Sequence, residues 1–169
     1  MRLLVGPLQE VPTLCGAHRP SHLVSWLSPP ATAPEIADTF AAERRLLLSS
    51  HDVAAPTEGY QAPSAEDVAR LVAFASTWDG AQPLLVHCWA GVSRSTAAAY
   101  VIACALSSRS EQELARALRQ ASPGATPNPL IVQHADALLG RDGRMAAAIA
   151  EIGRGAEVSL GAPFELLLL

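Results

Sequence analysis

The hydrophobic and polar positions predict short buried strands that alternate with amphipathic helices. Four apolar runs have the length of buried strands, and they cover residues 2–5, 22–28, 45–49 and 83–86. Six segments carry apolar residues at helical spacing, and they cover residues 35–45, 64–79, 97–106, 110–121, 128–139 and 142–152. A further strand is expected at 164–168. The alternation predicts an α/β fold, with a central, mostly parallel sheet of four to five strands flanked by helices.

Polar residues mark where several of these helices begin. Ser64 precedes a first turn with acidic residues, and Ser110 with Glu113 has the spacing of a capping box. Asn128 followed by Pro129 is typical of a helix start, and Asp142 is the expected cap of the last helix. These residues indicate where the helices before and after the strand at 83–86 begin.

Composition narrows the class of protein. Half of the 169 residues are hydrophobic and 17% are charged, which indicates a single globular domain that spans residues 1–169. The net charge is −4 and the chain has no basic run, so we expect no nucleic-acid partner. All 12 basic residues are arginine, which excludes a Walker A lysine and a Schiff-base lysine.

The cysteines and the ends of the chain bear on location. Cys15, Cys88 and Cys104 are odd in number and have no CxxC spacing, which argues against a disulfide framework or a zinc site. We therefore expect no metal, and a reducing, cytoplasmic compartment. The apolar ends are too short for a signal peptide or a membrane span, so no membrane partner is expected.

One stretch carries the chemistry. Cys88 and Arg94 bracket five residues between the strand at 83–86 and the apolar helix that follows. A strand, a tight loop and a helix N-terminus aim backbone N–H groups and partial positive charge at an anion, and Gly91 can supply a positive φ in that loop. The guanidinium of Arg94 would bind a phosphate with two donors, and the same field favours the thiolate of Cys88. Ser95 is placed to donate a hydrogen bond to that thiolate.

The run from His87 through Cys88, five residues, Arg94 and Ser95 resembles the signature loop of the cysteine-dependent protein tyrosine phosphatases, particularly the small dual-specificity branch. The resemblance covers roughly residues 20–140 and implies the fold of that family and no cofactor. It implies that Cys88 attacks phosphorus, that Arg94 holds the phosphoryl oxygens, that Ser95 assists hydrolysis of the intermediate and that His87 keeps the loop in shape. The implied phosphate-binding residues are Trp89, Ala90, Gly91, Val92, Ser93 and Arg94.

The family also uses an aspartic acid on a separate loop to protonate the leaving oxygen. Asp52 directly follows the apolar strand at 45–49 and lies 36 residues before Cys88, which matches the dual-specificity arrangement. Glu58 lies in the same long, proline-bracketed loop and is the alternative acid. We therefore expect Asp52, or else Glu58, to act as the general acid and base.

The loop interior indicates the substrate. Phosphoinositide phosphatases of this superfamily carry basic residues there, whereas residues 89–93 have no charge, and Trp89 is expected to line or pack beneath the loop. We expect a phosphatase acting on phosphorylated proteins or peptides at phosphotyrosine, alone or together with phosphoserine and phosphothreonine, and binding phosphate-like anions such as vanadate and sulfate. Two alternatives stay open: a non-catalytic phosphopeptide-binding module on the same fold, and a rhodanese-like sulfurtransferase.

Overall fold

The computed structural model describes residues 1–168; residue 169, the end of the expected domain, lies outside the described residues. The strands are β1 (Arg2–Pro7), β2 (His22–Leu27), β3 (Arg45–Ser49), β4 (Leu84–Cys88) and β5 (Phe164–Leu167). They form one sheet in the order β3-β2-β4-β1-β5, in which only β5 runs antiparallel to its neighbour, β1. The prediction of a mostly parallel α/β sheet is confirmed. β4 lies at the centre, so its C-terminal end has a parallel strand on each side.

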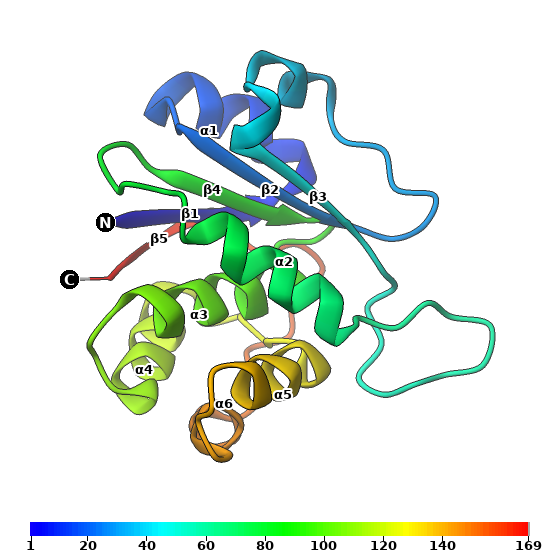
Figure 1. The fold of residues 1–169 in the computed structure, drawn as a ribbon, viewed down its shortest axis with the longest axis vertical. Coiled ribbons are helices and arrows are strands. Elements are labelled where there is room, and N and C mark those ends of the chain that lie inside the picture. Colours follow the sequence, from blue (N-terminus) through cyan, green and yellow to red (C-terminus); the bar gives the residue numbers. More distant parts are fainter. Residues whose placement is uncertain (169) are drawn as a thin grey trace.

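Helices cover both faces of the sheet (Figure 1). One face carries a short 3₁₀ turn (Leu8–Glu10), α1 (Val11–His18) and two more 3₁₀ turns (Glu35–Thr39 and Ala42–Arg44). Apolar residues of α1 and of the turn Glu35–Thr39 pack with Leu4, Leu23 and Leu85 of the sheet. The other face carries α2 (Ala65–Ala75), α3 (Arg94–Leu106), α4 (Glu111–Ala121), α5 (Pro129–Leu138) and α6 (Arg144–Ile152). No helix among residues 1–168 is both long enough and apolar enough to cross a membrane.

The expected helix at 35–45 is wrong. Phe40 and Ala41 adopt extended backbone conformations between the two 3₁₀ turns and divide the segment. The division brings the chain into β3, and Arg45 at the start of that strand donates back to the carbonyl oxygen of Ala37 (2.9 Å). The apolar residues Ile36 and Phe40 still pack on the sheet, so the pattern indicated burial correctly and the element type incorrectly.

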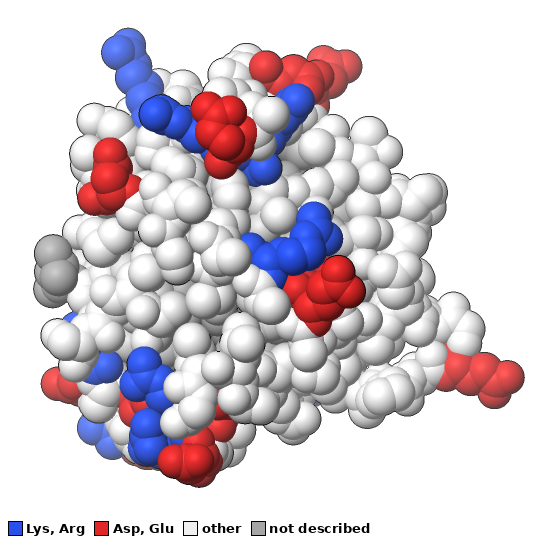
Figure 2. Space-filling model, viewed as in Figure 1, with Lys and Arg blue, Asp and Glu red and all other residues white. Residues whose placement is uncertain are grey.

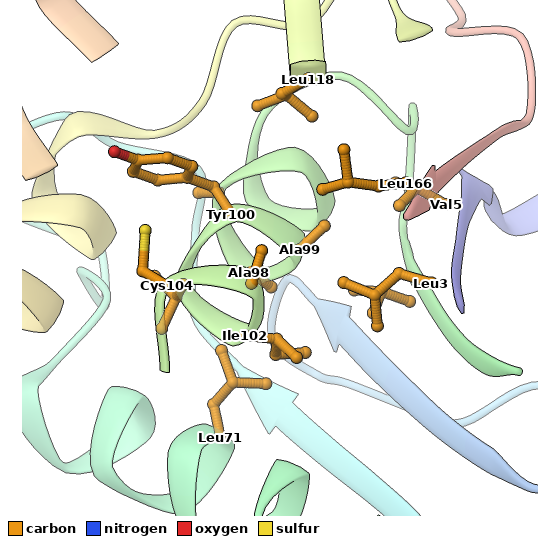
Figure 3. Packing of buried hydrophobic residues seen from close by; sticks show 14 of the residues in the cluster. Leu3, Val5, Leu71, Ala98, Ala99, Tyr100, Ile102, Cys104, Leu118 and Leu166 are labelled. Atoms are coloured by element: carbon orange, nitrogen blue, oxygen red, sulfur yellow. The ribbon is translucent and has the colours of Figure 1, made fainter. Parts of the chain in front are cut away.

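α3 is the helix that the rest of this face surrounds. Every residue from Arg94 to Cys104 is buried. Figure 3 shows Leu3 and Val5 of β1 and Leu166 of β5 on one side of the helix. Leu71 of α2 lies below the helix in this view, and Leu118 of α4 lies above it. The alanines at 97–99 are fully buried, and their small side chains let the elements around the helix approach it closely. This packing fixes where the N-terminus of α3 lies.

The helix caps predicted for α2 and α4 are present in the structure, whereas the cap predicted for α6 is not. Ser64 caps α2 and Ser110 forms a capping box with Glu113 at α4, as predicted, and Ser64 also forms a capping box, with Asp67. The cap expected from Asp142 is wrong, because that residue has a positive φ of 50° and an exposed side chain. The buried carboxylate of Asp136 in α5 instead accepts from the backbone of Gly143 (2.6 Å) and Met145 (2.7 Å), which joins α5 to the start of α6.

His87 lies inside the sheet and links the loop after β4 to β2. Its Nε2 is 2.7 Å from the hydroxyl of Ser25, and its Nδ1 is 3.3 Å from the carbonyl oxygen of Cys88. Because that carbonyl can only accept, Nδ1 carries the proton and Nε2 accepts from Ser25. Burial lowers the pKa of His87 to about 4, against a smaller opposing effect of the bond to Cys88. The imidazole is therefore neutral at pH 7.

This lowered pKa predicts an acid-sensitive fold. Between pH 6.5 and about 4 the unfolded chain takes up a proton at residue 87 that the folded chain does not, so stability falls as the pH drops through that window. The total loss from this group is on the order of 3 kcal/mol. Urea unfolding at pH 7.5, 6, 5 and 4.5 measures it. In His87→Gln the free energy of unfolding should be lower at pH 7.5 and fall less steeply; parallel curves for the two proteins would contradict the assignment.

Candidate active site

The site is built around the thiol of Cys88 at the C-terminal end of β4. The side chain is 2% exposed, and its Sγ lies 3.1 Å from the hydroxyl oxygen of Ser95 and 3.2 Å from the backbone nitrogen of Gly91. Both groups can donate a hydrogen bond to a thiolate. The structure thus brings Ser95 within hydrogen-bonding distance of Cys88, as the sequence predicts.

The loop from Trp89 to Ser93 is held from outside through its carbonyl groups. Four of them accept hydrogen bonds from backbone N–H groups in three other segments: Leu8 to Trp89 (3.2 Å), Gly161 to Ala90 (2.8 Å), and Thr126 and Asn128 to Val92 (2.9 Å) and Ser93 (3.3 Å). In a trans peptide the N–H points opposite to the C=O. Pulling these carbonyls outward therefore turns the following N–H groups toward the inside of the loop, which is the geometry of an anion-binding nest.

Gly91 is required at the middle of this loop. Its φ is +72°, and a Cβ placed there would lie 2.6 Å from the backbone nitrogen of Pro7. A larger residue would meet both the strained backbone conformation and the end of β1. The loop can therefore be tight only because position 91 carries no side chain.

The N-terminus of α3 faces the loop without a side-chain cap. Ser93 is the N-cap residue, but its side chain makes no capping bond to the helix. Its hydroxyl instead donates to Oδ1 of Asp52 (2.7 Å). The first N–H groups of α3 and the positive end of its dipole are thus left for an anion.

Arg94 is 4% exposed and is fixed by one of its terminal nitrogens. Its Nη1 donates to the carbonyl oxygen of Ser50 (2.6 Å) and to the hydroxyl of Ser28 (3.0 Å). Its Nε is buried, and no residue among 1–168 accepts the proton. A buried donor without a partner is costly, and a phosphate oxygen would satisfy it. The guanidinium is thus a cation held in place with a donor to spare.

Asp52 lies beside the loop and is oriented by two side chains. Its Oδ1 accepts from the hydroxyl of Ser93 and from the side-chain nitrogen of Asn128 (2.8 Å), and the same nitrogen donates to the carbonyl oxygen of Val53 (3.1 Å). The side-chain oxygen of Asn128 caps α5 by accepting from Leu130 (3.0 Å) and Ile131 (3.2 Å). Asn128 therefore ties the Asp52 loop to a helix.

From the sequence, Asn128 is expected only to begin the helix that follows it. Its position before Pro129 predicts the capping oxygen, which the structure confirms, and leaves the side-chain nitrogen without an assigned role. A cap residue with a second hydrogen-bonding group is a weak signal of a further contact.

The alternative acid, Glu58, is not brought to the loop. It lies exposed in the turn from Thr57 to Tyr60, and no hydrogen bond or ion pair among the described residues joins its carboxylate to residues 87–95. His51 and Gln61 close the base of this loop. The backbone nitrogen of His51 donates to the carbonyl oxygen of Gln61 (2.7 Å), and the backbone nitrogen of Gln61 donates to Nδ1 of His51 (3.0 Å). That closure holds Asp52 near Ser93 and leaves Glu58 at the far end.

Trp89 is 67% exposed, so the expectation that it lines the back of the loop or packs beneath it is wrong. Its backbone carbonyl is held by Leu8, and its indole lines a cavity of about 470 Å³ together with Leu8, Leu27 and Pro30. Arg94 is the single charged residue among those that line it. This cavity therefore joins an apolar wall to the cation of the loop.

Charge is sparse around this end of the molecule. Residues 28–34 have no charged side chain, and residues 53–63 have one, Glu58. The loop after β3 projects at the right of Figure 1, and that side of the space-filling view is almost free of charged atoms (Figure 2). Among residues 1–168 no three His, Cys, Asp or Glu side chains gather where they could hold a metal ion. The charged side chains described at the loop are those of Arg94 and Asp52.

Neither a protein-family model nor a curated protein matches this sequence. Solved structures do match. The crystal structure of DUSP15 is similar with a TM-score of 0.61 and 18% identity, over 87% of this chain and 89% of that chain. The crystal structure of PTPMT1 in complex with PI(5)P gives 0.61 and 18%, over 83% and 94%, and another PTPMT1 structure gives 0.56 and 16% over the same shares. The chain therefore has the fold of the cysteine-dependent tyrosine and dual-specificity phosphatases.

Proposed function

We propose that this protein is a phosphatase that hydrolyses phosphotyrosine in proteins or peptides, alone or together with phosphoserine and phosphothreonine, through a cysteinyl-phosphate intermediate. One observation carries the proposal. The thiol of Cys88 accepts from the N–H of Gly91 in its loop, the buried Nε of Arg94 at the end of that loop has no partner among the described residues, and the carboxylate of Asp52 is bonded to Ser93 of the same loop. A nucleophile, an anion cradle and an acid thus occur together.

In the first step the Cys88 thiolate attacks phosphorus. The S–P bond forms as the bond from phosphorus to the leaving oxygen breaks, and Asp52 gives its proton to that oxygen. Because both protein bonds to the carboxyl group fall on Oδ1, Oδ2 is the atom that carries the proton. The guanidinium of Arg94 and the loop N–H groups hold the phosphoryl oxygens as charge spreads over them.

In the second step the carboxylate of Asp52 takes a proton from water as the water oxygen attacks phosphorus. The S–P bond breaks, inorganic phosphate forms, and Cys88 leaves as a thiolate. The hydroxyl of Ser95, 3.1 Å from Sγ, and the N–H of Gly91, 3.2 Å away, stabilise that leaving group by donating to it. Every proton and electron pair in the cycle is then accounted for by Cys88, Asp52 and water.

The surroundings of the loop support a singly phosphorylated substrate with an apolar leaving group. The five residues between Cys88 and Arg94 have no charge, and the adjoining cavity is lined by Trp89, Leu27 and Pro30. An aromatic ring attached to the phosphate would find apolar contact there. PTPMT1 has been crystallised with PI(5)P, but an inositol head group with several phosphates would meet one buried cation here, which favours phosphotyrosine.

Cys88→Ser is expected to abolish hydrolysis of p-nitrophenyl phosphate and to keep phosphate binding, because the hydroxyl is a poor nucleophile and the cradle is unchanged. Steady-state assays and calorimetric titration with inorganic phosphate measure the two effects. Residual turnover close to wild type would contradict the mechanism. Phosphopeptides and phosphoinositides offered to the same variant, and to wild type, identify the class of substrate that is trapped and hydrolysed.

Asp52→Asn is expected to lower kcat by about 10²–10⁴-fold, because the amide keeps an oxygen for Ser93 and cannot transfer a proton. Glu58→Gln is the matched control and should stay close to wild type. The loss should be smaller for a substrate whose leaving group is already acidic, such as p-nitrophenol, than for a phosphoserine peptide. A larger loss in Glu58→Gln than in Asp52→Asn would transfer the role to Glu58.

The same assays separate the alternatives. A non-catalytic phosphopeptide-binding module would bind phosphotyrosine peptides without vanadate-sensitive turnover. A rhodanese-like sulfurtransferase would transfer sulfur from thiosulfate to cyanide and would not depend on Asp52. The bond between Ser93 and Asp52 supports hydrolysis over both, since neither alternative needs a carboxylate beside the loop.

A further inference from the structure

The chain crosses the back of the phosphate-binding loop after α6. Residues 154–163, which we call the C-terminal strap, run from the end of α6 past residues 123–126 and past the loop, and then enter β5. The backbone nitrogen of Ala156 donates to the carbonyl oxygen of Pro123 (2.9 Å), and that of Gly161 donates to the carbonyl oxygen of Ala90 (2.8 Å). The strap is therefore hydrogen-bonded to the loop at one peptide group.

That peptide group is the one that serves the nucleophile. The carbonyl of Ala90 and the N–H of Gly91 belong to the same peptide unit, and the N–H points at Sγ of Cys88 at 3.2 Å. Because the two groups of a trans peptide point in opposite directions, a donor that holds the carbonyl outward also holds the N–H inward. Gly161 is thus joined to the thiol of Cys88 through one rigid plane.

The contact leaves no room for a side chain at position 161. A Cβ on Gly161 would lie 2.7 Å from the carbonyl oxygen of Gly91 and 3.4 Å from a methyl group of Val92. The obstacle is backbone of the loop itself, so a residue with a side chain must push the loop or lose the hydrogen bond. The close approach explains why glycine occupies this position, although its φ is not in the left-handed region.

The strap is anchored beyond the loop. β5 pairs with β1 from Arg2 to Val5, and Phe164 and Leu166 are buried in the core. The hydroxyl of Ser107 donates to the carbonyl oxygen of Leu168 (2.7 Å). The strap is therefore stretched between α6 and a paired strand, which keeps Gly161 against the loop.

We propose that the C-terminal strap shapes the anion site, and that Gly161 is a positioning residue that aims the Gly91 N–H at the nucleophile and at a bound phosphate. The proposal extends the proposed function, because it assigns to the strap the direction of one donor in that site. It concerns a segment outside residues 20–140, the part that resembles the phosphatase family.

The test compares Gly161→Ala with two other glycine substitutions in the full chain. Gly155→Ala strains the same strap, because a Cβ there would lie 2.5 Å from the backbone of Gly124, but it does so away from the 90–91 peptide. Gly16→Ala is the control for the substitution itself, since nothing lies within 4 Å of a Cβ at that position. The readouts are the hydrogen-exchange rate of the Gly91 amide, the dissociation constant for inorganic phosphate, and kcat for p-nitrophenyl phosphate.

Gly161→Ala is expected to speed exchange at Gly91, to weaken phosphate binding and to lower kcat by about 10²-fold, the size of effect seen when one oxyanion donor is lost. Gly155→Ala should lower the unfolding temperature while keeping the exchange rate of the Gly91 amide near wild type, and Gly16→Ala should change none of the three readouts. Wild-type values in Gly161→Ala, or equally fast exchange at Gly91 in Gly155→Ala, would overturn the proposal.

The outcome does not depend on the proposed function being correct. If the wild-type protein hydrolyses no phosphomonoester, the hydrolytic mechanism fails, while the exchange rate of the Gly91 amide still decides whether Gly161 positions that peptide. A Gly91 exchange rate in Gly161→Ala as slow as in wild type would then overturn the proposed role of Gly161, and fast exchange confined to this variant would support it.

Discussion

The site depends on the direction in which a few peptide groups point. A loop of five residues has too few internal hydrogen bonds to fix its own carbonyls, and here four of them are fixed by N–H groups from the 3₁₀ turn after β1, the segment before α5 and the C-terminal strap. Each bond turns a carbonyl away from the space that Cys88 faces and turns an N–H toward it. Distant parts of the chain thus set the polarity of the cradle.

The burial of α3 makes that arrangement rigid. A helix exposed on one face could shift along its axis, whereas α3 is enclosed by the sheet and by α2 and α4 (Figure 3). Its first turn is therefore fixed relative to β4. The N-cap residue Ser93 then has no need to cap the helix with its side chain, and its hydroxyl holds Asp52. Stability of the helix comes from packing, which leaves the polar groups at its N-terminus for other partners.

The sequence predicts those parts of the site that local patterns of apolar and polar residues mark, and not those that depend on contacts between distant residues. The strand, loop and helix around Cys88 are visible because burial leaves an apolar run on both sides of a short spacing, and the proximity of Ser95 follows from that geometry. Asn128, the outward position of Trp89 and the strap are not visible in the same way. Asn128 reaches Asp52 over 76 residues, and Gly161 acts through a backbone N–H, which every residue except proline possesses. The catalytic roles stay predictions.

The misassigned segment at 35–45 and the missed strap share one physical cause. Hydrophobic periodicity reports which side chains are buried, and Ile36 and Phe40 are indeed packed on the sheet. It does not report how the backbone between them satisfies its hydrogen bonds. Where those bonds go to another segment, as from Arg45 to Ala37 or from Gly161 to Ala90, tertiary contacts decide the local conformation.

Arg94 is the only buried cation among the described residues, and under the proposed function it shapes what the site would recognise. The site offers short, directional bonds from Arg94, and the nearly uncharged loops around it add no further attraction for an anion. A substrate would then be held chiefly by the phosphoryl group itself and by contact of its leaving group with Trp89 and the apolar side of the cavity. A second phosphate on the same molecule would have to give up water without gaining a partner, at a cost that an aromatic ring does not incur. Under the proposed function, discrimination between substrates would therefore follow from the scarcity of charge together with this apolar contact.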